Sequence, residues 1–112
     1  MGPVEAASAA TCNGVNKHVW VSYPDPNTGV GVEDVYLDSC KVKNLRDKFG
    51  SAKDAISLGA LLGASFWPIG VTGGVLFAWA WNNQAQLTGC SQNNKGVRIR
   101  MWAGLVTGCY AQ

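Results

Sequence analysis

The chain has 112 residues, a length that predicts a single domain. Hydrophobic residues make up 47% and charged residues 14%, so it can bury a core, although so small a domain often needs covalent cross-links. After Asp54, the last acidic residue, the only charges are Lys95, Arg98 and Arg100. Three basic residues without a basic stripe argue against nucleic-acid binding. The part of the chain after Asp54 is thus apolar and cationic, which suits an anionic membrane surface.

Four cysteines predict two disulfides, for which three pairings are possible. We favour Cys12–Cys40 and Cys90–Cys109, because each pair closes the ends of one block of sequence. The alternative is four buried free thiols. No metal site is expected, because no two cysteines have the short spacing of a zinc knuckle and His18 is the only histidine. Disulfides indicate an extracytoplasmic destination, so we expect a secreted protein.

The first part of the chain, residues 1–11, is expected to be a flexible leader or a processing remnant ahead of one domain over residues 12–112. It contains Ala7-Ser8-Ala9, the small-residue pattern of a signal-peptidase site. A β-hairpin is predicted over residues 12–40.

The two strands of this first hairpin are predicted from alternation. "HVWVSY" (His18–Tyr23) alternates as a strand does, and "VGVEDVYL" (Val30–Leu37) resumes as the second strand. Between them, "PDPNTG" is dense in turn-forming residues. The residues directly after Cys40 are expected to extend a strand, "NLRDKFG" to form a helical turn, and Ser51 to cap a helix that begins at Ala52.

An apolar helical hairpin is expected over residues 52–88, because this stretch has no charged residue after Asp54. Pro68 and Gly70 cannot easily continue a helix, so they divide it into arms of roughly 52–66 and 72–87. Each arm is about 22 Å long, which is short for a permanent span across roughly 30 Å of hydrocarbon.

The ends of the second arm carry capping candidates. Thr72 is expected to cap its start, and Gly89 to end it.

The hairpin holds the residues that we expect to enter a membrane. "GALLG" is a G-x-x-x-G pattern, which allows close helix approach, and tryptophan favours the membrane interface. Trp67 lies beside the hairpin tip, where first contact with lipid is expected. The membrane-inserting candidates are Gly59, Gly63, Phe66, Trp67, Pro68, Trp79 and Trp81. The alternative is that the hairpin is simply a permanent core.

A second β-hairpin is predicted over residues 93–112. "VRIRMW" alternates strongly, and Ala103–Gly104 is a candidate two-residue turn into "LVTGCY". Arg98 and Arg100 share one face of the first strand. Together with Lys95 they are the candidates for binding anionic headgroups, and the alternative is a solvated strand face.

Catalysis finds little support in the sequence. His18 is a lone histidine in a strand pattern, and such residues are usually structural. No nucleophile elbow, metalloprotease motif, calcium loop or phosphate loop is present. We therefore expect no enzyme, no catalytic residue and no cofactor.

The apolar stretch "SLGALLGASFWPIGVTGGVLFAWAW", the cationic end "KGVRIRMW" and the paired cysteines resemble secreted antibacterial toxins and bacteriocins of Gram-positive bacteria. The charge-free hairpin also resembles that of colicin-type pore-forming domains. The likeness is one of composition and layout over roughly residues 54–112. It implies action on a target-cell membrane, and an immunity or carrier protein as a partner.

The sequence thus predicts an α+β fold: a small disulfide-stapled domain with antiparallel β-hairpins packed around a central apolar helical hairpin. The function it favours is a secreted antibacterial toxin that inserts this hairpin into a membrane and depolarises the cell. The alternative is a soluble secreted protein-binding module, such as an adaptor, inhibitor or immunity-type protein. In that alternative the hairpin is a permanent core and the aromatic strands form the binding face.

Overall fold

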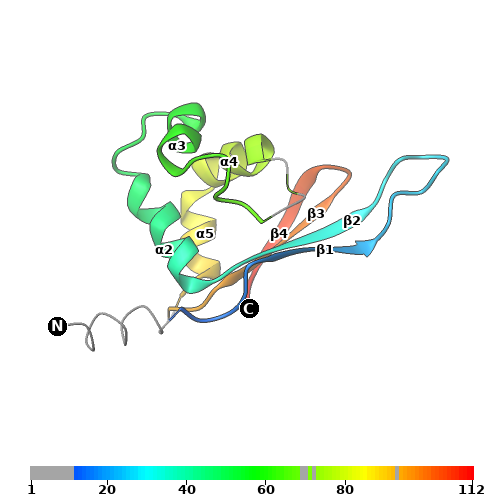
Figure 1. Ribbon diagram of the computed structural model, residues 1–112, viewed down its shortest axis with the longest axis horizontal. Helices are drawn as coiled ribbons and strands as arrows, with labels where there is room; N and C mark the ends of the chain where they lie inside the picture. Colours follow the sequence, from blue (N-terminus) through cyan, green and yellow to red (C-terminus); the bar gives the residue numbers. More distant parts are fainter. Residues whose placement is uncertain (1–11, 69–70, 72, 93) are drawn as a thin grey trace.

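Four antiparallel strands form one sheet, and four helices of the described residues cover one face of it (Figure 1). The computed structural model describes residues 12–68, 71, 73–92 and 94–112, so the leader expected over residues 1–11 and the expected cap Thr72 lie outside the described residues. The elements are β1 (Lys17–Ser22), β2 (Val32–Leu37), α2 (Ser39–Lys48), α3 (Ala55–Leu62), α4 (Gly73–Asn82), α5 (Gln84–Cys90), β3 (Val97–Trp102) and β4 (Leu105–Ala111). The predicted α+β class is confirmed.

The strands follow one another across the sheet in chain order. Both predicted β-hairpins are confirmed, and β2 pairs with β3 to join them, with Val35 opposite Ile99. Ala103 and Gly104 form the predicted turn, with φ of 54° and 79°. Positive φ at both positions matches the twist of the flanking strands. The β1–β2 loop extends well beyond the helices (Figure 1).

The arrangement of the hairpins corrects one expectation. They do not enclose a central helical hairpin, because they share one sheet and the helices form a single layer on one of its faces (Figure 1). A sheet with one apolar face needs only one covering layer. The apolar hairpin α3–α4 is one part of this layer, which α2 and α5 complete.

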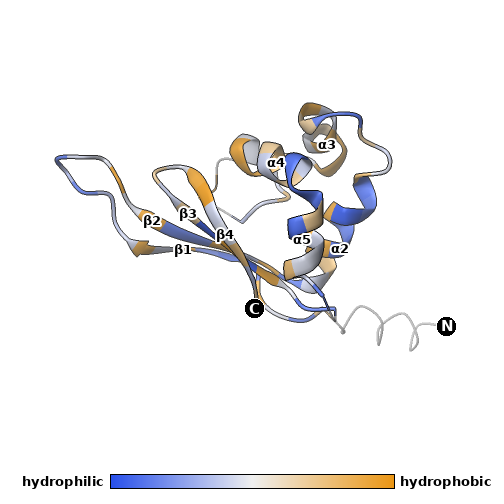
Figure 2. Cartoon of the chain, turned by 180° about the vertical axis from the view of Figure 1, so that it is seen from behind, coloured by the Kyte–Doolittle hydropathy of each residue, from blue (hydrophilic) through white to orange (hydrophobic). Residues whose placement is uncertain are grey.

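Helix α2 replaces the strand extension that was expected after Cys40. The side chain of Asp38 accepts a hydrogen bond from the backbone N–H of Lys41 at 2.8 Å, so the helix begins directly after β2. Val42 and Leu45 of α2 are buried in the core. Much of the rest of α2 is hydrophilic, whereas α4 is largely hydrophobic (Figure 2).

Helix α3 begins at Ala55 rather than Ala52, because Asp54 and not Ser51 is its cap. The Asp54 carboxylate accepts from the backbone N–H of Ser57 at 2.7 Å, and the Ser57 hydroxyl accepts from that of Asp54 at 3.1 Å. This reciprocal pair is a capping box. The helix ends at Leu62, since Gly63 has a φ of 89°.

The second predicted arm consists of two helices. Asn83 separates α4 from α5, and its side-chain amide donates to the Trp79 carbonyl at 2.9 Å. Gly89, expected to end the arm, lies inside α5, for which Ser91 is the C-cap. Because the chain bends between α4 and α5, α5 packs over the sheet, and its Leu87 is fully buried.

The core lies between the helices and the sheet. The sheet contributes five buried side chains and the helices cover them. Those from the sheet are Val35, Leu37, Val97, Ile99 and Met101, and those from α3 and α4 are Leu58, Leu76, Phe77 and Ala80.

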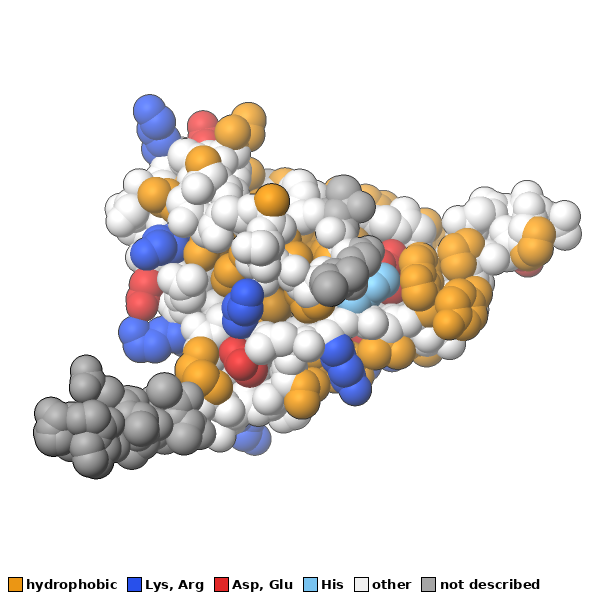
Figure 3. Space-filling model, viewed as in Figure 1, with side chains coloured by type: hydrophobic (Ala, Val, Ile, Leu, Met, Phe, Trp, Pro, Cys, Tyr) orange, Lys and Arg blue, Asp and Glu red, His pale blue; other side chains and the backbone are white. Residues whose placement is uncertain are grey.

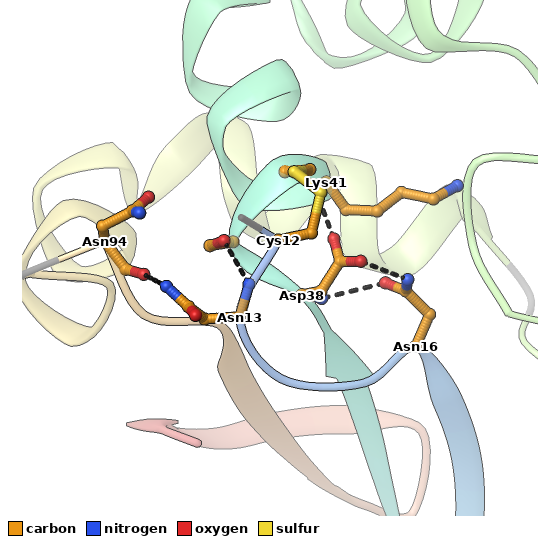
Figure 4. The surroundings of a disulfide bond; sticks show 8 residues. Cys12, Asn13, Asn16, Asp38, Lys41 and Asn94 are labelled. Carbon is orange, nitrogen blue, oxygen red and sulfur yellow. Dashed lines mark hydrogen bonds between the residues drawn. A yellow bond between two sulfur atoms is a disulfide. The ribbon is translucent and has the colours of Figure 1, made fainter. Parts of the chain in front are cut away.

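Both predicted disulfides are confirmed. Cys12 pairs with Cys40 in the first turn of α2, and Cys90 at the end of α5 pairs with Cys109 of β4. Figure 4 shows the surroundings of the Cys12–Cys40 bond, where the segment before β1 meets α2. Two disulfides in so small a domain are compatible with an extracellular protein.

Candidate functional site

The face of the sheet opposite the helices is the candidate site, and we call it the open face. Since successive strand residues point to opposite sides, the neighbours of the buried core residues on β2 and β3 point here. The strand register arranges the open face in three rows across the sheet. The rows are Lys17, Tyr36, Arg98 and Tyr110; then Val19, Asp34, Arg100 and Gly108; then Ser22, Val32, Trp102 and Leu105.

The first row alternates cations with aromatic rings. The Lys17 ammonium lies 4.9 Å from the centre of the Tyr36 ring, and the Arg98 guanidinium lies 4.6 Å from that of Tyr110. Tyr110 lies over Gly108, since a Cβ added there would fall 2.5 Å from its hydroxyl. A larger residue at position 108 would therefore displace the tyrosine. Each cation of the row is thus in contact with a neighbouring tyrosine ring.

The second row holds a buried carboxylate. Asp34 is 3% exposed and accepts two hydrogen bonds from Arg100, both 2.9 Å, and a longer one of 3.4 Å from Arg98. The hydrogen bond from Arg100 lowers the pKa of Asp34 despite its burial, and Asp34 raises the pKa of Arg100. Both guanidinium groups are thereby held in place.

The third row is mostly apolar and largely exposed. Trp102 is 52% and Leu105 64% exposed, and both lie at the end of the sheet nearest the β1–β2 loop. Val21 and Tyr23 of the neighbouring strand and loop are also exposed. Hydrophobic side chains gather at this end of the molecule (Figure 3). The open face thus combines an apolar end with a cationic and aromatic end.

The predicted headgroup-binding residues divide between two places. Arg98 and Arg100 share one strand face, as the alternation predicts, but both are held by Asp34 rather than left as free cations. Lys95 precedes β3 and instead lines a groove between α2 and α5. The structure therefore does not bring the three together. Tyr36, Tyr110 and Asp34 belong to the site and were not among the predicted residues.

The predicted membrane-inserting residues lie along α3, α4 and the segment between them. Phe66 and Trp67 are buried, and the Trp67 ring lies 5.2 Å from that of Phe77. Trp67 therefore faces the core, not the solvent, and would have to leave it to meet lipid. Among the described residues, no helix is both long and apolar enough to cross a membrane.

Only one glycine of the G-x-x-x-G pattern, Gly59, lies at a contact between helices. A Cβ on Gly59 would lie 3.1 Å from the Phe77 ring of α4, so the two helices meet there. Gly63 ends α3, and no atom of the described residues lies within 4 Å of the corresponding position. Pro68 follows the buried pair Phe66–Trp67 and is half-buried.

The two later tryptophans of this set, Trp79 and Trp81, lie on α4 and are half-buried. Trp81 packs edge to face against Phe49, with ring centres 6.3 Å apart. Asn83 and Gln84 donate side-chain hydrogen bonds to the carbonyls of these two tryptophans. Both rings are thus part of the packing between α4 and its neighbours.

His18 lies on the helix side of the sheet. Its Nε2 is 2.7 Å from a carboxylate oxygen of Glu33, and its ring meets that of Trp20 edge to face. These contacts satisfy the histidine within the sheet. No group of three or more His, Cys, Asp or Glu side chains in the described ranges could hold a metal ion.

Comparison with known proteins gives no family for this chain: no family model, no curated protein and no solved structure matches it.

Proposed function

We propose that this protein is a secreted binding module that holds an acidic protein partner on the open face. The observation that carries the proposal is the uncovered sheet face with three cations, Lys17, Arg98 and Arg100, against one buried carboxylate. Interfaces are enriched in arginine, tyrosine and tryptophan, and all three occur here. Complementary charge would speed association and set the orientation of the partner.

The rigidity of the open face supports the proposal. Arg98 and Arg100 are fixed by Asp34, and Arg98 also packs on Tyr110. Side chains that are ordered before binding lose less conformational entropy when the partner arrives. Trp102 and Leu105 would supply the apolar anchor.

The test begins with affinity capture from the extracellular fluid of the source organism, followed by purification of the captured protein. Its affinity is then measured by biolayer interferometry for the wild type, Trp102→Ala and Tyr110→Ala, with Ile56→Ser as the control on the helical side. We expect each open-face variant to weaken binding about tenfold or more, and added salt to weaken wild-type binding. A captured protein that binds all four chains equally would overturn the proposal.

A second candidate is the membrane-active antibacterial toxin. It is favoured by exposed apolar residues on the helical hairpin: Ile56 is 85% exposed, and Leu61 and Val75 are exposed as well. Dye release from vesicles containing anionic lipid, together with growth inhibition, would test it. Leakage that Ile56→Ser or Leu61→Ser reduces and Trp102→Ala does not would favour this function over the first. No leakage at micromolar protein would eliminate it.

A further inference from the structure

We propose that the groove between α2 and α5 is a binding site for a small anionic molecule that carries phosphate or carboxylate groups. The groove has a volume of about 580 Å³, within the range of small-molecule sites. Its walls, α2 and α5, belong to the helical layer on one face of the sheet (Figure 1), whereas the open face is the other face. The proposal is thus independent of the protein partner proposed above.

The charges of the groove are mostly positive. Lys43, Arg46 and Lys95 line it together with a single acidic residue, Asp47. Asp47 is 2.8 Å from the Lys43 ammonium, so these two charges offset each other. Within the described part of the chain, Arg46 and Lys95 form no ion pair. Two cations that have no ion-pair partner among the described residues, Arg46 and Lys95, therefore line one concave surface.

The interior of the groove is polar as well as concave. Ser39 and Ser91 are buried and bring hydroxyl groups to its lining, while Val42 and Phe49 supply apolar contact. The Ser91 hydroxyl donates to the Thr88 carbonyl, whereas the Ser39 hydroxyl accepts a bond from a backbone N–H. Among the described residues the Ser39 hydroxyl donates to no protein acceptor, so it can donate to a ligand oxygen. Such a mixture suits a small polar molecule better than an apolar one.

Covalent and hydrogen bonds hold both walls of the groove in place. Cys12–Cys40 ties the first turn of α2, and Cys90–Cys109 ties the end of α5 to β4. Asn13, next to Cys12, joins the two sides (Figure 4). Its backbone N–H donates to the Ser39 hydroxyl at 2.7 Å and its side-chain amide to the Asn94 carbonyl at 2.9 Å. A site formed in advance binds without the cost of ordering its walls.

The experiment is a titration of isotope-labelled protein with pyrophosphate and, separately, with succinate, followed by the backbone amide signals. The two probes distinguish a phosphate site from a carboxylate site. We expect one of them to give saturable shifts confined to α2, α5 and the residues just before β3. We expect Arg46→Gln combined with Lys95→Gln to weaken this binding about tenfold or more, and salt to weaken it too.

The controls are Lys53→Gln and Lys17→Gln, which each remove an exposed cation outside the groove. Neither should change the affinity. Arg46→Lys in the presence of Lys95 should retain most of the binding, because the charge remains. The amide spectrum itself reports whether each variant is folded. Shifts that do not saturate, or that the control variants reduce as much as the groove variant does, would overturn the proposal.

Discussion

At the scale of single residues, Asp34 organises the open face. It is the one carboxylate between two arginines, and it is buried although it points to the uncovered side. Asp34→Asn keeps the size of the side chain but leaves both guanidinium groups without their charged acceptor. We expect the free energy of unfolding to fall by about 1–3 kcal/mol, as measured by urea denaturation at pH 7.

The control for this variant is Asp25→Asn, since Asp25 is exposed in the β1–β2 loop. It should change the stability much less. Equal stability of the wild type and Asp34→Asn would show that the ion pair contributes nothing to the fold.

The effect of Asp34 should depend on pH. Arg100 lowers the pKa of Asp34 in the folded state below its ordinary value of about 3.9. The extra stability is therefore present above that value and is lost as the pH falls through the lower, folded pKa. We expect the difference between the wild type and Asp34→Asn to be constant from neutral pH down to about pH 5 and to shrink below about pH 4. Urea denaturation across this range measures it, and a difference that grows on acidification would contradict it.

At the scale of elements, the contact between α3 and α4 depends on Gly59. Because a Cβ added there would lie 3.1 Å from the Phe77 ring, Gly59→Val must push the ring or the helix aside. We expect a loss of about 1–3 kcal/mol in the free energy of unfolding, measured in urea.

The matched control is Gly74→Ala on α4. No described residue has an atom within 4 Å of its Cβ position, and its backbone is not in the left-handed region. Alanine should therefore raise the stability by roughly 0.5 kcal/mol through helix propensity. If both substitutions destabilise equally, the close approach at Gly59 has no special role.

At the scale of the whole molecule, the two disulfides supply stability that so small a core lacks. They close loops with sequence separations of 28 and 19 residues, and each contributes on the order of 3 kcal/mol by the loop-entropy model. We expect Cys12→Ser with Cys40→Ser, and Cys90→Ser with Cys109→Ser, each to lower the free energy of unfolding by about that amount. Urea denaturation of the two double variants measures it, and an unchanged midpoint in either would contradict it.

The features that could be predicted from the sequence are those that neighbouring residues determine. The strands β1 and β3 follow from the alternation in His18–Tyr23 and Val97–Trp102, and each cysteine pair closes one block of sequence, so the strands and the disulfides were both predicted. The start of α3 was wrong because Ser51 and Asp54 are both good caps. Ser57, which completes the capping box, decides between them.

The open face could not be predicted from any single stretch of the sequence, because its residues come from both hairpins. Arg98 and Arg100 could be placed on one strand face, but their acceptor Asp34 lies more than sixty residues earlier, on a strand of the other hairpin. The pairing of β2 with β3 depends on tertiary packing, which alternation does not encode. For the same reason, two separate hairpins around a helical core were expected where one sheet exists.

The placement of the disulfides has a consequence for the order of folding. Each bond lies within one half of the chain, around β1–β2 or around β3–β4, and neither connects β2 to β3. Oxidation can therefore finish in both halves before the halves meet. Pairing β2 with β3 brings together residues as distant as Asp34 and Arg100, 66 positions apart, and such long-range closure is slow. In refolding from the reduced chain, we expect both native bonds to be trapped early, in a species whose central strand pair has not yet closed.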